Sequence, residues 1–168
     1  MAYDGRNFGN RQGGGRSGPG GDPNYKKGKL PEGYLSGGYF EVIDGEKALR
    51  PEYIVKYPKE IAEKLSSQNE WEKWNSPQNK RSQVRRFYEY GLRIQGLLRR
   101  KHNHFAAVEA ELGRLLPFVK YAESRGTVSV LFRNFIDRNI TAVHDGEDLN
   151  AFVKHFEAVI AYLPKEKN

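Results

Sequence analysis

The residues best suited to chemistry are arginines that recur along one segment. Residues 80–101 contain eight Lys or Arg and a single acidic residue, Glu89. Arg86, Arg93 and Arg100 are seven residues apart, so on a helix they form a row roughly 21 Å long. A guanidinium group binds phosphate through paired N–H donors, and a row of one charge sign suits a polyanion, whose condensed counterions it releases. The spacing therefore predicts a phosphate-binding surface, and the alternative is a solvated helix face.

A long amphipathic helix over residues 76–101 must position these arginines. At about 100° per residue, the apolar side chains fall on the side opposite the arginine row. Ser76 and Pro77 suit the N-cap and the first helical position. The apolar positions are Val84, Phe87, Tyr88, Gly91, Ile94 and Leu98.

Further apolar stripes predict the body that carries this helix. They begin after Pro58 and recur over residues 105–119, 128–136 and 149–163, with an expected kink or break at Pro117 and an N-cap at Asp145. Helical stripes joined by short loops make a bundle. We therefore expect an all-α fold, a compact bundle of about five helices spanning residues 58–168.

The first part of the chain has a different composition. Twelve of the 18 glycines lie within residues 1–38, together with several arginines and few aliphatic residues. Such a segment cannot offset the entropy cost of ordering. We predict a disordered Gly/Arg-rich arm over residues 1–37, followed by an extended lead-in over residues 38–57 that packs on the body.

Catalytic and metal-binding patterns are sparse. The chain has no cysteine, which excludes disulfides and a cysteine-based zinc site. His102 and His104 form a His-x-His pair without further ligands. A small ribonuclease using these residues or His155 is an open alternative, but we expect no enzyme activity, metal or cofactor. No apolar run is long enough to span a bilayer, and no signal sequence is evident, so a cytoplasmic protein without a membrane partner is expected.

Three segments together resemble a known family. Residues 82–88 (Ser-Gln-Val-Arg-Arg-Phe-Tyr), 117–122 with Phe135-Ile136, and 152–162 are similar to the small subunit of type III-A CRISPR effector complexes, the Csm complexes. The resemblance covers about residues 38–163. It implies an all-α subunit without a catalytic site, several copies of which stack as an inner filament.

The resemblance also implies partners: guide RNA and target RNA, backbone subunits with RNA-recognition folds, a large polymerase-like subunit and further copies of the same chain. Because base pairing reads the sequence in such complexes, the subunit need only contact the RNA backbone. For Arg85 the alternative is a salt bridge with Glu89. The candidate RNA-binding residues are Lys80, Arg81, Arg85, Arg86, Arg93, Arg100 and Arg133.

A second function fits the same composition. The chain carries a net charge of +7, which is also typical of free-standing nucleic-acid-binding proteins. In that case the Gly/Arg-rich arm would be the main contact, and deletion of residues 1–29 would remove most of the RNA affinity.

Overall fold

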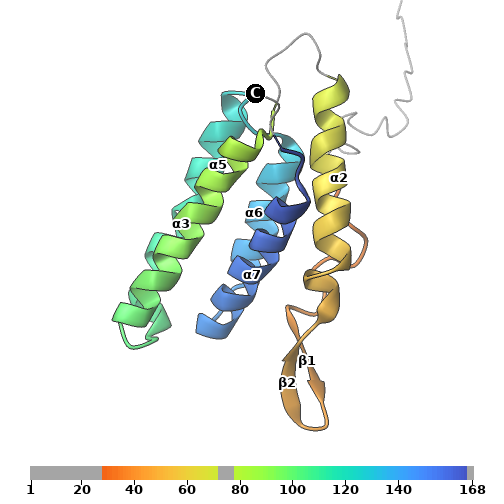
Figure 1. Cartoon of the computed structure of the whole chain (residues 1–168). Helices are drawn as coiled ribbons and strands as arrows, with labels where there is room; N and C mark the ends of the chain where they lie inside the picture. The colour runs from red at the N-terminus through yellow and green to blue at the C-terminus, as the bar shows by residue number, and fades with distance from the viewer. Residues whose placement is uncertain (1–27, 72–77, 166–168) are drawn as a thin grey trace, which may run out of the picture.

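A computed structural model describes residues 28–71 and 78–165 of the chain. These residues form mostly helices, with one small two-stranded sheet (Figure 1), which confirms the prediction of an all-α bundle. In chain order the elements are β1 (Phe40–Ile43), β2 (Glu46–Leu49), the 3-10 helix η1 (Pro51–Tyr53), α2 (Lys56–Trp71), α3 (Arg81–Arg100), the 3-10 helix η2 (Phe105–Ala107), α4 (Glu109–Gly113), α5 (Leu115–Ser124), α6 (Val130–Ala142) and α7 (Gly146–Tyr162).

Helix α7 is the central element of the bundle. It packs against α2 and against α3, while α5 packs against α6 (Figure 1). Phe152, Phe156 and Val159 of α7 are almost fully buried. Asp145 caps the helix as predicted, because its Oδ1 accepts a hydrogen bond from the Asp148 backbone N–H at 2.8 Å. The apolar periodicity of this segment thus builds the core on which the other helices pack.

The lead-in over residues 38–57 contains a hairpin that the sequence pattern did not predict. Strands β1 and β2 pair antiparallel, with Phe40 opposite Leu49. Asp44 and Gly45 connect them with φ angles of 52° and 83°. An Asp-Gly pair favours such a two-residue turn, because both residues tolerate positive φ. Only an extended lead-in was expected over these residues, and the pairing of its two strands was missed.

The predicted disordered arm needs a correction in its last part. Tyr34 and Leu35 are about 95 % buried, and Arg138 donates a hydrogen bond to the carbonyl oxygen of Leu35 at 3.2 Å. A large buried ring supplies the burial energy that a glycine-rich segment otherwise lacks. Residues 28–37 therefore belong to the folded body, whereas the prediction for residues 1–27 lies outside the described residues.

Helix α3 begins later than predicted. It starts at Arg81, and the turn before it is held by Asn79, whose side chain bonds Ser129 in both directions at 2.9 and 2.8 Å. Asn79 adopts a left-handed φ of 57°, which asparagine tolerates but a helix does not. The proposed Ser76–Pro77 cap lies outside the described residues.

The interruption of the helix that was expected at Pro117 lies three residues earlier, at Arg114. Helix α4 ends at Gly113, and α5 begins at Leu115, so that Pro117 lies in the first turn of α5. Backbone N–H groups in a first helical turn have no partner within the helix, so the missing donor of proline costs little there. Pro117 thus belongs to the start of a helix and does not kink one.

Candidate nucleic-acid interface

One face of α3 holds the helix on the bundle and leaves the opposite face in solvent. Val84, Gly91, Ile94 and Leu98 are buried. A Cβ built on Gly146 would lie 3.1 Å from Leu98 Cδ2, which shows how closely the start of α7 approaches α3. Because this face is packed against the bundle, the side chains on the opposite face of α3 point toward solvent.

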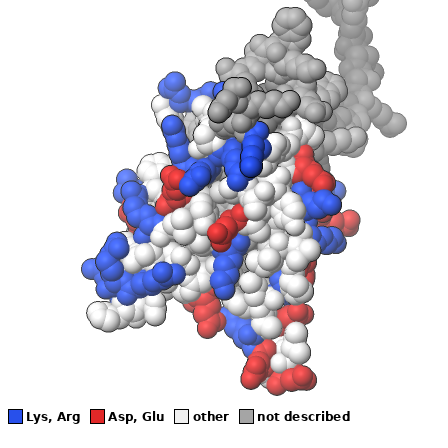
Figure 2. All heavy atoms as spheres, viewed as in Figure 1, with Lys and Arg blue, Asp and Glu red and all other residues white. Residues whose placement is uncertain are grey.

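The arginine row lies on that outward face. Arg86, Arg93 and Arg100 are all exposed, and among the described residues none of them forms an ion pair with a carboxylate. Arg93 also stacks on the ring of Tyr90, with its guanidinium carbon 4.3 Å from the ring centroid. Figure 2 shows many Lys and Arg side chains over the region where α3 lies, while acidic side chains are scattered over this face and also lie at the hairpin end. The row is therefore available to an anion.

Arg85 is exposed but paired. Its Nε lies 2.9 Å from Glu89 Oε1, and both side chains remain more than half exposed. The salt-bridge alternative named for this residue is thus what the structure contains. Because exposed ion pairs contribute little, about 0.2–1 kcal/mol, this pair leaves Arg85 able to exchange Glu89 for another anion at small cost.

Of the other predicted contacts, Arg81 and Arg133 are less available than the row, whereas Lys80 is exposed. Arg81 donates a hydrogen bond to the carbonyl oxygen of Leu163 at 3.1 Å, and Lys80 is exposed at the N-cap position. Arg133 lies on α6, where its Nε is 3.1 Å from Glu123 Oε2 and its Nη1 is 3.8 Å from Asp137 Oδ2. Arg133 thus links α5 to α6. Its ion-pair partners lie on these two helices and not on α3.

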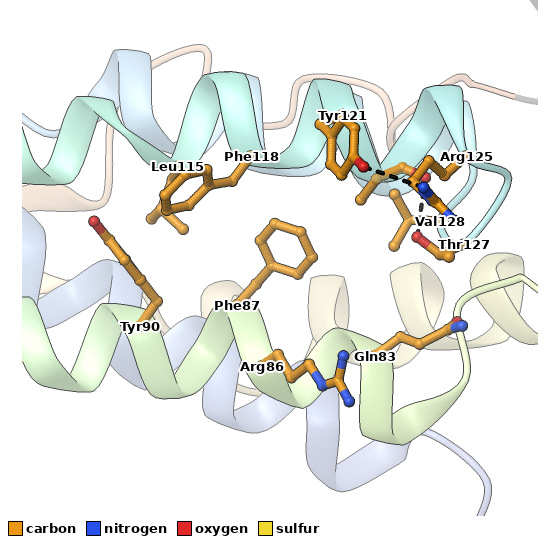
Figure 3. A pocket seen from close by; sticks show the side chains of 11 residues that line it. Gln83, Arg86, Phe87, Tyr90, Leu115, Phe118, Tyr121, Arg125, Thr127 and Val128 are labelled. Carbon is orange, nitrogen blue, oxygen red and sulfur yellow. Dashed lines mark hydrogen bonds between the residues drawn. The ribbon is translucent and has the colours of Figure 1, made fainter.

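A groove between α3 and α5 adds residues that the sequence pattern did not single out. Its volume is about 430 Å³. In Figure 3, Phe87 projects from α3 into the space between the two helices, and Tyr121 of α5 lies beside Arg125, the C-cap residue of that helix. An aromatic residue three or four positions from an arginine, on a helix face that remains exposed, is the sequence signal for such a surface. The lining residues are Gln83, Arg86, Phe87, Tyr90, Leu115, Phe118, Tyr121, Ala122, Arg125, Thr127 and Val128.

His155 lies in the core, whereas His102 and His104 are exposed. His155 is fully buried, and its Nδ1 lies 2.6 Å from the carbonyl oxygen of Tyr53. Because a carbonyl only accepts, Nδ1 carries the proton, and Nε2 accepts from the Tyr34 hydroxyl at 2.6 Å. Burial lowers the pKa of His155 to about 4, which keeps the ring neutral at physiological pH. His155 is therefore part of the core's hydrogen-bond network and is closed to a substrate.

Neither a cluster of metal ligands nor a membrane-spanning helix is found in the part of the chain that the structure describes. Within residues 28–71 and 78–165, no group of three or more His, Cys, Asp or Glu residues is placed to hold a metal ion. Over the same residues, no helix combines the length and the apolar character that crossing a membrane requires.

Comparison with known proteins identifies one family. The family model described as Csm2 Type III-A matches residues 50–166. Comparisons with curated proteins and with solved structures found no match. The matched region contains α2 to α7, and hence the arginine row and the groove, whereas the β1–β2 hairpin precedes it.

Proposed function

This chain belongs to the Csm2 family of type III-A CRISPR systems, and is thus a subunit of a type III-A complex; we propose that its part there is to bind RNA through phosphates without catalysis. The observation that supports this most directly is the exposed row of Arg86, Arg93 and Arg100, none of which lies within ion-pair distance of a carboxylate of the described residues. A guanidinium group without a carboxylate partner keeps its donors for phosphate oxygens.

The shape of the row supports a backbone contact. Three charges at seven-residue spacing on one straight helix match an extended strand better than a compact ligand, because they are spread over roughly 21 Å. Neighbouring phosphates on one strand are several ångströms apart, so several can meet the row at once. Contacts of this kind carry no base information. The subunit accordingly binds any guide–target duplex, and base pairing within the duplex supplies the specificity.

The remaining parts of the proposal rest on the family. We place the chain beside guide and target RNA, among backbone subunits and a large polymerase-like subunit, stacked with further copies of itself. In this arrangement the subunit is structural and cleaves nothing. The buried position of His155 supports this, since the ring is unable to serve as a general base for RNA.

The test replaces the row and compares it with an equal change of charge elsewhere. Arg86, Arg93 and Arg100 are changed together to Ala, and the control changes Lys29, Lys56 and Lys59 to Ala. The control residues are exposed and lie before or on α2, which packs on α7. Binding of two RNA duplexes of unrelated sequence is measured at several salt concentrations.

We expect the row variant to weaken binding of both duplexes by the same factor. The slope of log affinity against log salt should become shallower by about 2–3, roughly one for each phosphate that is no longer neutralised. The control should change the slope by much less. Equal effects of the two variants would mean that only net charge matters, and weaker binding of one duplex alone would contradict a backbone contact.

A further inference from the structure

We propose that the groove between α3 and α5 binds an unpaired nucleobase of the RNA strand whose phosphates lie along the arginine row. This inference rests on the proposed RNA-binding function and adds a second kind of contact to it. The groove takes the flat face of a base, whereas the row takes the backbone.

The walls of the groove present aromatic rings to solvent. Phe118 is 40 % exposed and Tyr121 is 62 % exposed, although both lie on a helix that packs on the bundle. Tyr90 packs edge-on against Phe118, with ring centroids 5.4 Å apart at 88°. The floor is apolar and closed, since Leu115 and Val128 are almost fully buried. A flat aromatic ligand can thus contact exposed aromatic rings on the walls and an apolar floor beneath them (Figure 3).

Arginines stack on the rings that surround the groove. The guanidinium carbon of Arg93 lies 4.3 Å from the Tyr90 centroid, that of Arg114 lies 5.4 Å from the Phe118 centroid, and that of Arg125 lies 5.7 Å from the Tyr121 centroid. This alternation of rings and cations is what single-stranded RNA sites use, because bases stack on rings while cations follow the backbone.

The charge of the groove favours RNA over other occupants. Its lining includes Arg86 and Arg125 and no acidic residue. The carboxylate of Glu111, which contacts the Tyr90 hydroxyl, is already bound: it accepts from that hydroxyl at 2.7 Å and from Arg114 at 3.2 Å. A cationic segment of this chain, or a second copy that presents its own arginines, would meet like charge there.

Arg86 joins the two surfaces. It is the first member of the arginine row and also lines the groove, so a strand bound along the row passes the mouth of the groove. A base paired within a duplex is stacked and hidden, but a base at a gap, bulge or single-stranded end is free to turn toward Tyr121 and Phe118. The groove therefore distinguishes unpaired from paired positions without reading sequence.

The experiment uses the full chain and a short oligouridine that carries one 2-aminopurine, a fluorescent base that is quenched when it stacks. The variants are Tyr121→Leu and Phe118→Leu, which keep apolar volume but remove the ring face. Tyr162→Leu is the matched control, since Tyr162 is also about half exposed but lies on α7, outside the groove. Affinity for a fully paired duplex is measured in parallel.

We expect wild-type protein and Tyr162→Leu to quench the probe, and the two groove variants to quench it far less. Their affinity for the single strand should fall about tenfold, as expected when one base no longer stacks on a ring. Affinity for the duplex and the salt dependence should remain unchanged, because the arginines that meet phosphate are intact.

Other results would overturn the inference while leaving the proposed function testable. Unchanged quenching and affinity in both groove variants would mean that no base enters the groove. A change in oligomeric state of the RNA-free protein in Tyr121→Leu, with unchanged quenching, would identify the groove as an interface between copies. Failure of the proposed function has a different signature, since the arginine-row variant would then bind duplex as well as wild type does.

Discussion

Helices α3 and α7 lie against each other but expose opposite chemistry. Helix α3 contains six arginines and one acidic residue, and four of its twenty residues are buried. Helix α7 contains one lysine and three acidic residues, and eight of its seventeen residues are buried. Both helices are amphipathic and pack against each other, so an amphipathic pattern alone does not reveal a helix's role. The position of each helix in the bundle decides how much of it is buried. Helix α7 lies between two helices, whereas α3 keeps a broad face in solvent.

The two helices also use polar groups differently. On α7, His155 is buried and makes two short hydrogen bonds, so its partners are fixed by the fold. On α3, Arg86 and Arg100 are exposed and have no carboxylate partner among the described residues. Buried polar groups must be satisfied within the protein, while exposed cations are free to bind a ligand. If α3 binds RNA as proposed, stability and binding depend on different helices.

The largest expected effect is on stability and falls on α7. Phe156 packs against Phe135 and Phe152, with ring centroids 5.2 and 5.7 Å apart. Phe156→Ala should lower the free energy of unfolding by about 3–5 kcal/mol, because the small side chain leaves a cavity. Arg86→Ala on α3 should change it by less than about 0.5 kcal/mol. Urea denaturation measures both, and similar decreases in the two variants would contradict this division of roles.

The second prediction concerns pH and again separates α7 from the surface. The folded pKa of His155 is about 4, below the ordinary histidine value of 6.5. Above pH 6.5 the ring is neutral in both states and costs nothing. Between pH 6.5 and 4, His155 is protonated in the unfolded chain but stays neutral in the folded one. The free energy of unfolding therefore decreases by up to about 3 kcal/mol as the pH falls.

The measurement is a series of denaturation curves from pH 7.5 to 4. His155→Gln keeps a donor and an acceptor but does not titrate, so its stability should fall less steeply in this range. His104→Gln removes an exposed histidine and should follow the wild-type profile. A His155→Gln profile parallel to that of the wild type would show that the buried ring does not set the pH dependence.

The parts of this structure that were predictable depend on neighbours in the sequence. The α7 stripe and the Asp145 cap follow from spacings of three and four residues, so they were readable directly. The outward position of the arginine row follows equally from the apolar face of the same helix. The Asp44-Gly45 turn also carried a local signal, but the weakly strand-forming segment Glu46–Leu49 concealed it.

The missed features depend on residues far apart. Tyr34 was assigned to a disordered arm, but its hydroxyl bonds His155, 121 positions later, and no local pattern reveals that contact. The groove has the same origin. Phe118 and Tyr121 become a wall only because α5 faces Phe87 and Tyr90 of α3. Composition predicted the charge of the surface, whereas its aromatic wall required the packing of two helices.

The smallest expected effect tests whether pairing alone sets Arg85 apart from its neighbours on α3. Glu89 lies 2.9 Å from Arg85, and Glu89→Gln would release the guanidinium into the same face as the row. RNA affinity should rise about two- to threefold, and the salt dependence should steepen by up to about one neutralised phosphate. The free energy of unfolding should fall by no more than about 0.5 kcal/mol, since the pair is exposed.

The control for this gain is Glu63→Gln, which makes the same charge change at an exposed position of α2. Because charges farther apart than about 10 Å are largely screened at moderate salt, a change on α2 should have less influence on a strand bound at α3. If the two variants raise affinity equally at about 0.15 M salt, the bound RNA responds to the field of the whole molecule. If only Glu89→Gln does so, the RNA lies along α3. The ion pair of Arg85 then affects how α3 binds RNA and not how stably the protein folds.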